Sequence, residues 1–143
     1  MAKKFSFRLE PVLKLRSYKV SLAKDSLVQV LNQRRNKEQQ ISEHKNYYNQ
    51  LLKTEINSTQ ASEFQAQYYH KNFIFNEIIK LNNEKEQLLE IESFHRTKLT
   101  EAMKQEKILK KLKEKKQDLY NEENQKEETL TLDEIARTRH GRS

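Results

Sequence analysis

Residues 11–30 read "PVLKLRSYKVSLAKDSLVQV", and this stretch decides the fold class. It opens with Pro11, the only proline of the chain, and proline suits the first turn of a helix because the N–H that it lacks would find no partner there. Leu13, Val20 and Leu27 then recur at a step of seven, which is typical of one seam of a coiled coil. We therefore expect a long amphipathic helix that begins at residue 11.

The seam continues at the same step with Arg34, Ile41 and Tyr48. A companion row lies three residues further on at each step. That row consists of Arg16, Ala23, Val30, Lys37, His44 and Leu51. The middle of the seam is therefore interrupted by polar residues.

Helix breakers are missing from almost the whole chain. Residues 12–140 contain neither glycine nor proline, where average usage predicts about 15 such residues. Hydrophobic residues make up 34% of the chain and charged residues also 34%, which is too polar for a compact core but sufficient for a narrow seam. Abundant Leu, Lys, Glu and Gln are good helix formers. The predicted fold class is all-α.

A second apolar row predicts a second helix. It consists of Ile74, Ile78, Leu81, Leu88, Leu99, Ala102 and Leu109, interrupted by the polar Lys85, Glu92, His95 and Glu106. The polar stretch "INSTQAS" (56–62) separates the two rows. We expect one coiled-coil rod over residues 1–143, an antiparallel two-helix hairpin. Its first helix covers residues 11–56, its turn 57–61 and its second helix 62–137.

The two predicted helices differ in length. At 1.5 Å per residue they span about 70 Å and about 115 Å, so about 30 residues of the second helix have no partner in the hairpin. This overhang carries the strongest charge blocks. Residues 104–116 hold seven lysines and two glutamates, net +5, and residues 117–134 hold seven acids and one lysine, net −6. Pairs such as Glu106 with Lys110 can support the helix locally, and exposed blocks of this kind favour partner docking.

Catalytic, cofactor and metal sites find no support in the sequence. The only glycine is Gly141, so no glycine-rich loop can cradle a phosphate. The chain has no cysteine, and its four histidines form no metal-binding motif. No apolar run is long enough to cross a membrane, and the N-terminus lacks the pattern of a secretory signal. We expect a soluble cytoplasmic protein that is not an enzyme, has no catalytic residues, cofactor or metal, and is a monomer in isolation.

Nucleic-acid binding is the main alternative from composition. The net charge of +7 and the basic block 104–116 would suit phosphates. However, an acidic block of similar size follows at once. A basic-zipper protein requires its basic block before the seam, whereas here the basic block comes after it. We therefore expect no nucleic-acid partner.

Aromatic residues gather on both sides of the predicted turn. They are Tyr47, Tyr48, Phe64, Tyr68, Tyr69, Phe73 and Phe75. Neighbours on a helix point about 100° apart, so adjacent pairs such as Tyr47–Tyr48 cannot both face one seam. We expect exposed aromatic surface there, and exposed aromatics are frequent binding anchors.

Both ends of the chain resemble one family. The opening "F-x-FRLEPVLKLR" (5–16) is similar to the start of the flagellar export protein FliJ, and "KKLKEKKQDLYNEENQKEETLTLDEIARTR" (110–139) is similar to its end. The resemblance covers essentially the whole chain. It implies an antiparallel two-helix coiled coil similar to the central stalk of rotary ATPases. The related stalk of virulence type III secretion systems would share this architecture and is the alternative.

The resemblance also implies partners. FliJ-like proteins are thought to insert into the hexameric ring of the flagellar export ATPase and to promote its assembly and activity. They also contact the large membrane protein of the export gate and interact with export chaperones. The protein would then lie at the cytoplasmic face of the inner membrane, as a peripheral component of the export apparatus.

These expectations translate into two sets of candidate residues. The candidates for contact with the ATPase ring are Phe5, Phe7, Arg8, Leu9, Leu13, Arg16, Lys110, Lys113, Lys116, Tyr120, Asp133 and Glu134. The candidates for contact with the export gate are Tyr47, Tyr48, Tyr68, Tyr69, Phe73 and Phe75. The first set follows from the similar termini, and the second from the aromatic cluster.

Overall fold

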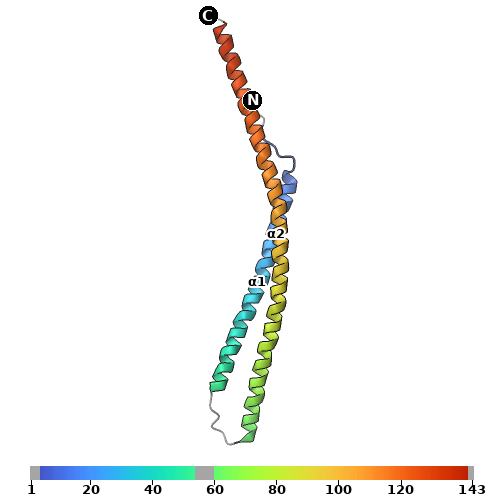
Figure 1. Ribbon diagram of the computed structural model, residues 1–143, viewed down its shortest axis with the longest axis vertical. Helices are drawn as coiled ribbons and strands as arrows, with labels where there is room; N and C mark the ends of the chain where they lie inside the picture. The colour runs from blue at the N-terminus through green and yellow to red at the C-terminus, as the bar shows by residue number, and fades with distance from the viewer. Residues whose placement is uncertain (1–3, 54–59, 142–143) are drawn as a thin grey trace. The chain divides into compact units, whose positions relative to one another are not determined.

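The protein is all-α throughout the part of the chain that the computed structural model describes, residues 4–53 and 60–141 (Figure 1). α1 covers Glu10–Lys53, 44 residues, and α2 covers Ala61–His140, 80 residues. The described residues contain no strand. The predicted fold class is confirmed, and its reason is simple. Neither helix contains glycine, and the single proline is the second residue of α1.

The start of α1 follows from its first backbone hydrogen bonds. The Glu10 N–H donates to the Phe7 carbonyl at 3.1 Å, and the Leu13 N–H donates to the Leu9 carbonyl at 2.9 Å. Pro11 has no N–H and loses no bond at this position. Glu10 places a negative charge in the first turn, where the helix dipole favours it. Residues 4–7, which alternate like a strand in sequence, are irregular coil.

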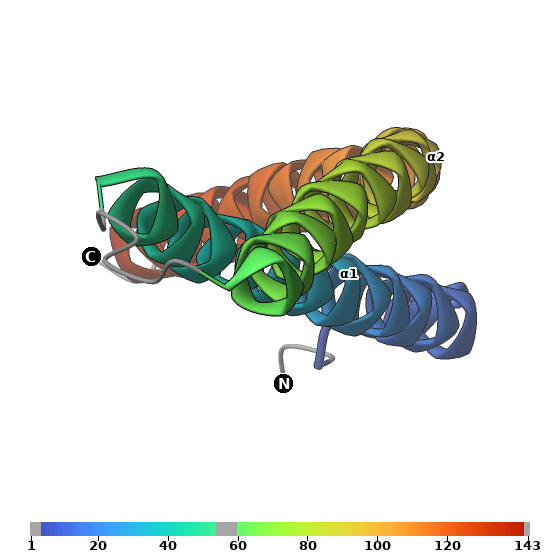
Figure 2. The same cartoon turned by 90° about the horizontal axis from the view of Figure 1, so that it is seen from below.

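The connection between the helices falls on residues 54–59, so most of the turn predicted at 57–61 lies outside the described residues. On its far side, the Gln60 carbonyl accepts hydrogen bonds from the N–H groups of Glu63 at 3.2 Å and Phe64 at 3.5 Å. These bonds close the first turn of α2. Figure 2 shows this start of α2, in green, from below.

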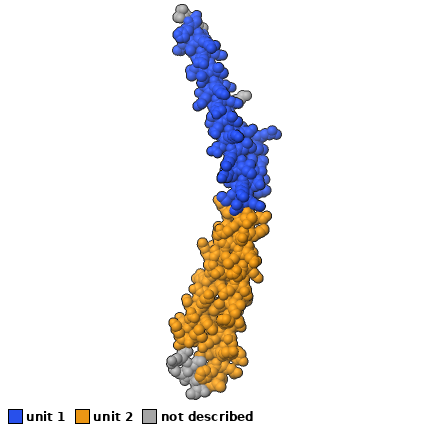
Figure 3. All heavy atoms as spheres, viewed as in Figure 1, with its two compact units in different colours: residues 1–21, 100–143 blue, residues 22–99 orange. Residues whose placement is uncertain are grey.

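The chain divides into two compact units (Figure 3). Unit 1 comprises residues 1–21 and 100–143, and unit 2 comprises residues 22–99. Each unit contains a stretch of α1 and a stretch of α2.

Unit 2 is held together by one apolar stripe from each helix. Its buried apolar side chains are Leu27, Val30 and Ile41 on α1, with Ile74, Ile78 and Leu81 on α2. All six are predicted seam positions. Cross-helix contacts show the antiparallel direction, because partner numbers on α2 fall as numbers on α1 rise. Arg34 pairs with Glu92, Lys37 with Glu84, and Tyr47 with His70.

Unit 1 has a smaller apolar cluster that includes the residues before α1. Phe7, Leu13 and Leu109 are buried together, and Phe5, Leu9 and Leu112 pack against them. The N-terminal segment therefore lies against α2 and covers part of its apolar stripe. Phe5, Phe7 and Leu9 alternate with polar residues as a strand would, but they form no strand and instead pack their side chains on α2.

Beyond Tyr120, α2 continues as a bare helix. Every residue from 121 to 140 is exposed except Asn124, which is half-buried. Twenty residues of helix span about 30 Å. We call this stretch, residues 121–140, the overhang. It confirms that α2 extends beyond the residues that pack against it within unit 1.

Candidate partner-binding surfaces

The N-terminal segment and the first turns of α1 are fastened to α2 by three kinds of contact. The rings of Phe5 and Tyr120 lie 5.6 Å apart between centroids, at an interplanar angle of 51°. The Lys113 ammonium lies 2.9 Å from a Glu10 carboxylate oxygen. Arg16 donates from Nη1 to the backbone carbonyl of Gln105 at 2.9 Å. These contacts brace the stretch of α2 from which the overhang projects.

This geometry divides the ring-contact candidates into two groups. Seven of them are buried or half-buried, namely Phe5, Phe7, Leu9, Leu13, Arg16, Lys113 and Tyr120. Each of these seven contacts other residues of its own unit. The other five, Arg8, Lys110, Lys116, Asp133 and Glu134, are exposed. Lys110 also forms the predicted pair with Glu106, at 3.1 Å. The exposed five can reach a partner, whereas the first seven shape the surface that carries them.

The aromatic residues of unit 2 are partly engaged with one another. The Tyr47 hydroxyl lies 2.9 Å from Nε2 of His70, and the two rings meet edge to face at 5.7 Å. Tyr48, which is half-buried, lies 6.1 Å from the Phe75 ring. These contacts join α1 to α2 near the turn.

Several aromatic residues near the turn also present much of their surface to solvent. Tyr68 and Tyr69 are each 63% exposed and Phe73 is 59% exposed, with Phe64 and Phe75 close to half exposed. We call this set, together with Tyr47 and Tyr48, the aromatic patch. Covering large apolar side chains of this kind with a partner stabilises the complex, so the patch is a candidate docking surface.

A charged layer crosses the middle of unit 2. Arg34 donates from Nε to Oε2 of Glu92 at 2.6 Å and from Nη1 to Oε1 of Glu38 at 2.6 Å. Glu92, only 6% exposed, also accepts from Arg96 at 2.8 Å. Further along, the Lys37 ammonium lies 2.6 Å from a Glu84 carboxylate oxygen. The layer therefore links α1 to α2 through opposite charges.

Hydrogen bonding shifts the ionisation of these groups. The bonds from Arg96 and Arg34 lower the pKa of Glu92 below its usual value, and the bond from Lys37 lowers the pKa of Glu84 in the same way. The bonds to Glu92 and Glu38 raise the pKa of Arg34. Both carboxylates and the guanidinium are therefore held in their charged forms.

Sequence reasoning identified the polar interruptions of the seam but not their partners. Arg34 and Lys37 interrupt the first seam, and Glu92 interrupts the second. The signal was the opposite sign of the charges on the two rows. Pairing the rows antiparallel from the middle of the predicted turn would have placed Arg34 opposite Glu84 rather than Glu92, so the spacing did not identify the pair.

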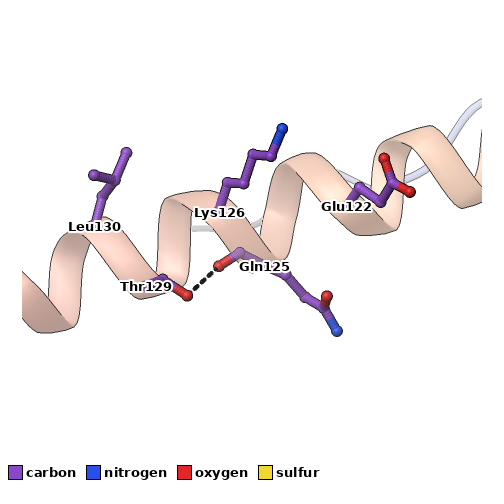
Figure 4. A pocket seen from close by; sticks show the side chains of 5 residues that line it. All are labelled: Glu122, Gln125, Lys126, Thr129 and Leu130. Carbon is purple, nitrogen blue, oxygen red and sulfur yellow. Dashed lines mark hydrogen bonds between the residues drawn. The ribbon is translucent and has the colours of Figure 1, made fainter.

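A shallow depression lies on the overhang (Figure 4). Its residues, Glu122, Gln125, Lys126, Thr129 and Leu130, all belong to α2. Thr129 uses its hydroxyl to donate to the Gln125 carbonyl at 2.8 Å, within the helix itself. One helix cannot enclose a small ligand, because pockets need walls on several sides. This surface suits a macromolecular partner instead.

Residues 4–53 and 60–141 hold no group of three or more metal-ligating side chains. Across the same ranges, neither helix has a stretch apolar and long enough to traverse a lipid bilayer.

Comparison with protein families gives the identity. The family model described as "Flagellar FliJ protein" matches residues 5–143, from Phe5 of the opening motif through both helices. Searches of the curated proteins and of the solved structures gave no match. The matched family is a non-catalytic accessory component of the flagellum that associates with the export apparatus. The chain therefore belongs to the FliJ family and is a flagellar protein related to protein export.

Proposed function

We propose that this protein acts as a stalk in the hexameric ring of the flagellar export ATPase, where it promotes ring assembly and ATP hydrolysis. The observation that carries the proposal is the overhang, an exposed helix of charged residues braced at its base by the N-terminal segment. Membership of the FliJ family supports the flagellar setting.

The chemistry of the overhang suits contacts that must form and break repeatedly. The overhang presents the exposed charges of Asp133 and Glu134, and the braced part of unit 1 before it presents those of Arg8, Lys110 and Lys116. All five charges remain solvated when they touch a partner. Such contacts are individually weak, at about 0–1 kcal/mol each. A ring that changes state during hydrolysis can exchange them without a large barrier. A continuous apolar surface would instead hold one subunit tightly.

Ring assembly follows from the same contacts. A stalk that touches several subunits at once binds the assembled ring better than a single subunit. Binding then shifts the assembly equilibrium by mass action. Higher ATPase activity is the expected consequence where only the ring hydrolyses ATP efficiently.

The aromatic patch is proposed to contact the large membrane protein of the export gate. Tyr68, Tyr69 and Phe73 are the most exposed aromatic side chains of unit 2. Their exposure leaves them available as anchors for a partner. With the stalk at the ring and the patch at the gate, the protein would lie at the cytoplasmic face of the inner membrane, within reach of export chaperones.

The ring proposal is tested by the ATPase rate of the matching export ATPase with and without purified protein. We expect the full chain to raise the rate and deletion of residues 121–143 to abolish the increase. This deletion removes the overhang but leaves the contacts of Tyr120 and Lys113 with the N-terminal segment. The truncated protein should therefore keep its helical circular dichroism.

Point variants sharpen the test. Replacing Arg8, Lys110 and Lys116 together by Ala should weaken the stimulation, because all three are exposed candidates. The matched control replaces Lys19, Lys24 and Lys45 by Ala, three exposed lysines of α1. Equal losses in both variants would point to net charge rather than to a binding surface, and an unstimulated ATPase with the full chain would refute the stalk.

The gate proposal has its own readout, binding to the isolated cytoplasmic domain of the gate protein. The double substitution Tyr68→Ser and Phe73→Ser should weaken binding at least about tenfold, the equivalent of 1.4 kcal/mol. Val28→Ser, which changes a 52% exposed apolar side chain of the same unit, is the control. Unchanged affinity in the double variant would remove the aromatic patch from the proposal.

Two alternatives predict different results. A nucleic-acid-binding protein would bind DNA or RNA with strong salt dependence, yet the acidic block directly follows the basic one here. A stalk from a virulence secretion system would stimulate its own ATPase rather than the flagellar one. The match to the flagellar family favours the flagellar ATPase.

A further inference from the structure

An apolar stripe on α2 lies beside the cluster around Phe7. It consists of Ile108, Leu119 and Leu130, which are 59%, 54% and 63% exposed. Each is 11 residues from the next, and 11 residues make about three turns plus 20°, so the three side chains share one face. Leu109, which packs against Phe7 and Leu13, lies about 80° round the helix from the middle of the stripe. Leu112, which packs on the same cluster, falls on the stripe's own face. Ile108, Leu119 and Leu130 are therefore the uncovered part of this face of unit 1.

Charges flank this stripe in a fixed order. Lys104, Lys115 and Lys116 come before Leu119 or beside it, and Glu122, Glu123 and Asp133 come after it. All six lie within about 60° of the stripe at 100° per residue, and all six are exposed. Among the described residues, these six side chains form no ion pair. The flanks of the stripe are therefore basic before Leu119 and acidic after it, while Lys126 lies on the stripe itself, at the same helical angle as Ile108.

A surface with this order complements itself when it is reversed. We propose that the stripe is covered by the same stripe of a second copy of this chain, in an antiparallel pair with its twofold axis at Leu119. In this arrangement Leu119 meets Leu119 of the second copy, and Ile108 meets Leu130 of the second copy. Three apolar layers then bury Ile108, Leu119 and Leu130. Lys126 lies between the layers of Leu119 and Leu130, opposite Leu112 of the second copy, where its aliphatic stem can cover apolar surface while its ammonium stays in water.

The flanking charges fix the direction. A twofold axis brings the same flank of both helices together. Lys115 then lies beside Glu122 of the second copy, and Lys104 beside Asp133, on one flank. On the other flank, Lys116 lies beside Glu123. In each pair the two residues are offset along the helices by one residue, about 1.5 Å, from lying directly opposite each other. The twofold axis produces every pair twice. A parallel pair would place lysine against lysine and acid against acid, which is unfavourable.

The pairing is expected to be weak and salt-sensitive. Exposed ion pairs contribute about 0.2–1 kcal/mol each, and only three apolar layers support them. The chain is thus a monomer when dilute and a dimer when concentrated. Self-pairing does not depend on the proposed stalk function, because it needs no other protein. If the overhang also enters a ring, the two uses of this helix exclude each other.

Directed cross-linking tests the geometry, because the full chain has no cysteine. L119C should form a disulfide-linked dimer on mild oxidation. I108C and L130C should cross-link to each other when mixed, but neither should cross-link alone. V28C is the control and should stay monomeric, because Val28 is an exposed residue of α1 in unit 2, away from the stripe in sequence. Self-linking of I108C at the rate of L119C would overturn the antiparallel pair.

Charge reversal tests the recognition by sedimentation equilibrium. K115E/K116E and E122K/E123K should each raise the dimer dissociation constant at least about tenfold, because like charges then face each other. Combining all four changes in one chain should restore the homodimer. Mixing the two double variants should give a heterodimer. Circular dichroism checks that each variant stays helical.

Salt provides the final readout. Between about 0.1 M and 1 M salt the Debye length falls from about 10 Å to about 3 Å, so dimerisation of the unmodified protein should weaken. A chain that remains monomeric at every concentration in low salt would overturn the proposal. So would reversal variants that dimerise as well as the original chain.

Discussion

Arg34 on α1 and Glu92 on α2 are 58 residues apart in sequence and share a hydrogen bond of 2.6 Å between Nε and Oε2. Both occupy seam positions where the heptad step calls for an apolar side chain. Their pairing satisfies two charges that would otherwise interrupt the interface. A polar pair at a seam is also a device that sets the register between helices, because a shifted alignment would leave both charges without partners.

Removal of one partner should therefore destabilise unit 2. Glu92→Leu leaves the guanidinium of Arg34 with Glu38 alone, and we expect a lower melting temperature by circular dichroism. The double variant Arg34→Met with Glu92→Leu should recover part of the loss, because it removes the remaining charge as well. A single variant as stable as the original protein would show that the pair contributes nothing.

The stability of the protein should fall on acidification. The pKa of Glu92 is lowered in the folded chain by its bonds to Arg96 and Arg34. A lowered folded pKa contributes stability above the unfolded pKa, and this is lost as the pH falls through the folded pKa. Glu84, held by Lys37, acts in the same direction.

The pH dependence has a matched variant. Glu92→Gln cannot ionise, so its melting temperature should fall less steeply than that of the original protein below the usual glutamate pKa. Melting curves across this range measure the difference. Parallel curves for both proteins would mean that Glu92 does not supply the acid-sensitive stability.

Phe7→Ala should loosen unit 1 selectively. Phe7 packs against Leu13 and Leu109, and loss of a buried Phe side chain costs about 3–5 kcal/mol in a compact core. This cluster is small, so we expect a loss toward the low end. Hydrogen exchange should accelerate in residues 10–21 and 100–120. Equal acceleration around Ile78 in unit 2 would contradict a local effect.

The aromatic patch should be dispensable for folding. Tyr68 and Phe73 are largely exposed, so their replacement by Ser should change the free energy of unfolding by no more than about 0.5 kcal/mol. Chemical denaturation measures this directly. A loss of several times that size would mean that the patch is part of the core and would weaken its case as a docking surface.

The apolar spacing predicted much of this architecture. The seam positions Leu13, Val20, Leu27, Ile41, Ile74, Ile78, Leu81 and Leu109 are all buried. The absence of helix breakers predicted two long helices, and the excess length of the second predicted the overhang. Local salt pairing was also predictable, since Glu106 and Lys110 are four residues apart on one helix.

Partner choice across the helices required the tertiary structure. A slip by one heptad preserves an apolar seam but changes every charged partner, so spacing alone could not pair Arg34 with Glu92. The same holds for the ring-contact candidates. The motif identified them together, but only packing showed that Phe7 and Leu13 are internal while Arg8 is exposed.

The sequence by itself therefore determined the helices, their apolar faces and the charge blocks of the C-terminal end, because each depends on residues close in the chain. Only the tertiary structure decided the register, the charged layer of unit 2 and the docking of the N-terminal segment on α2. These depend on which residues meet across tens of positions, and the heptad repeat is nearly the same at every step.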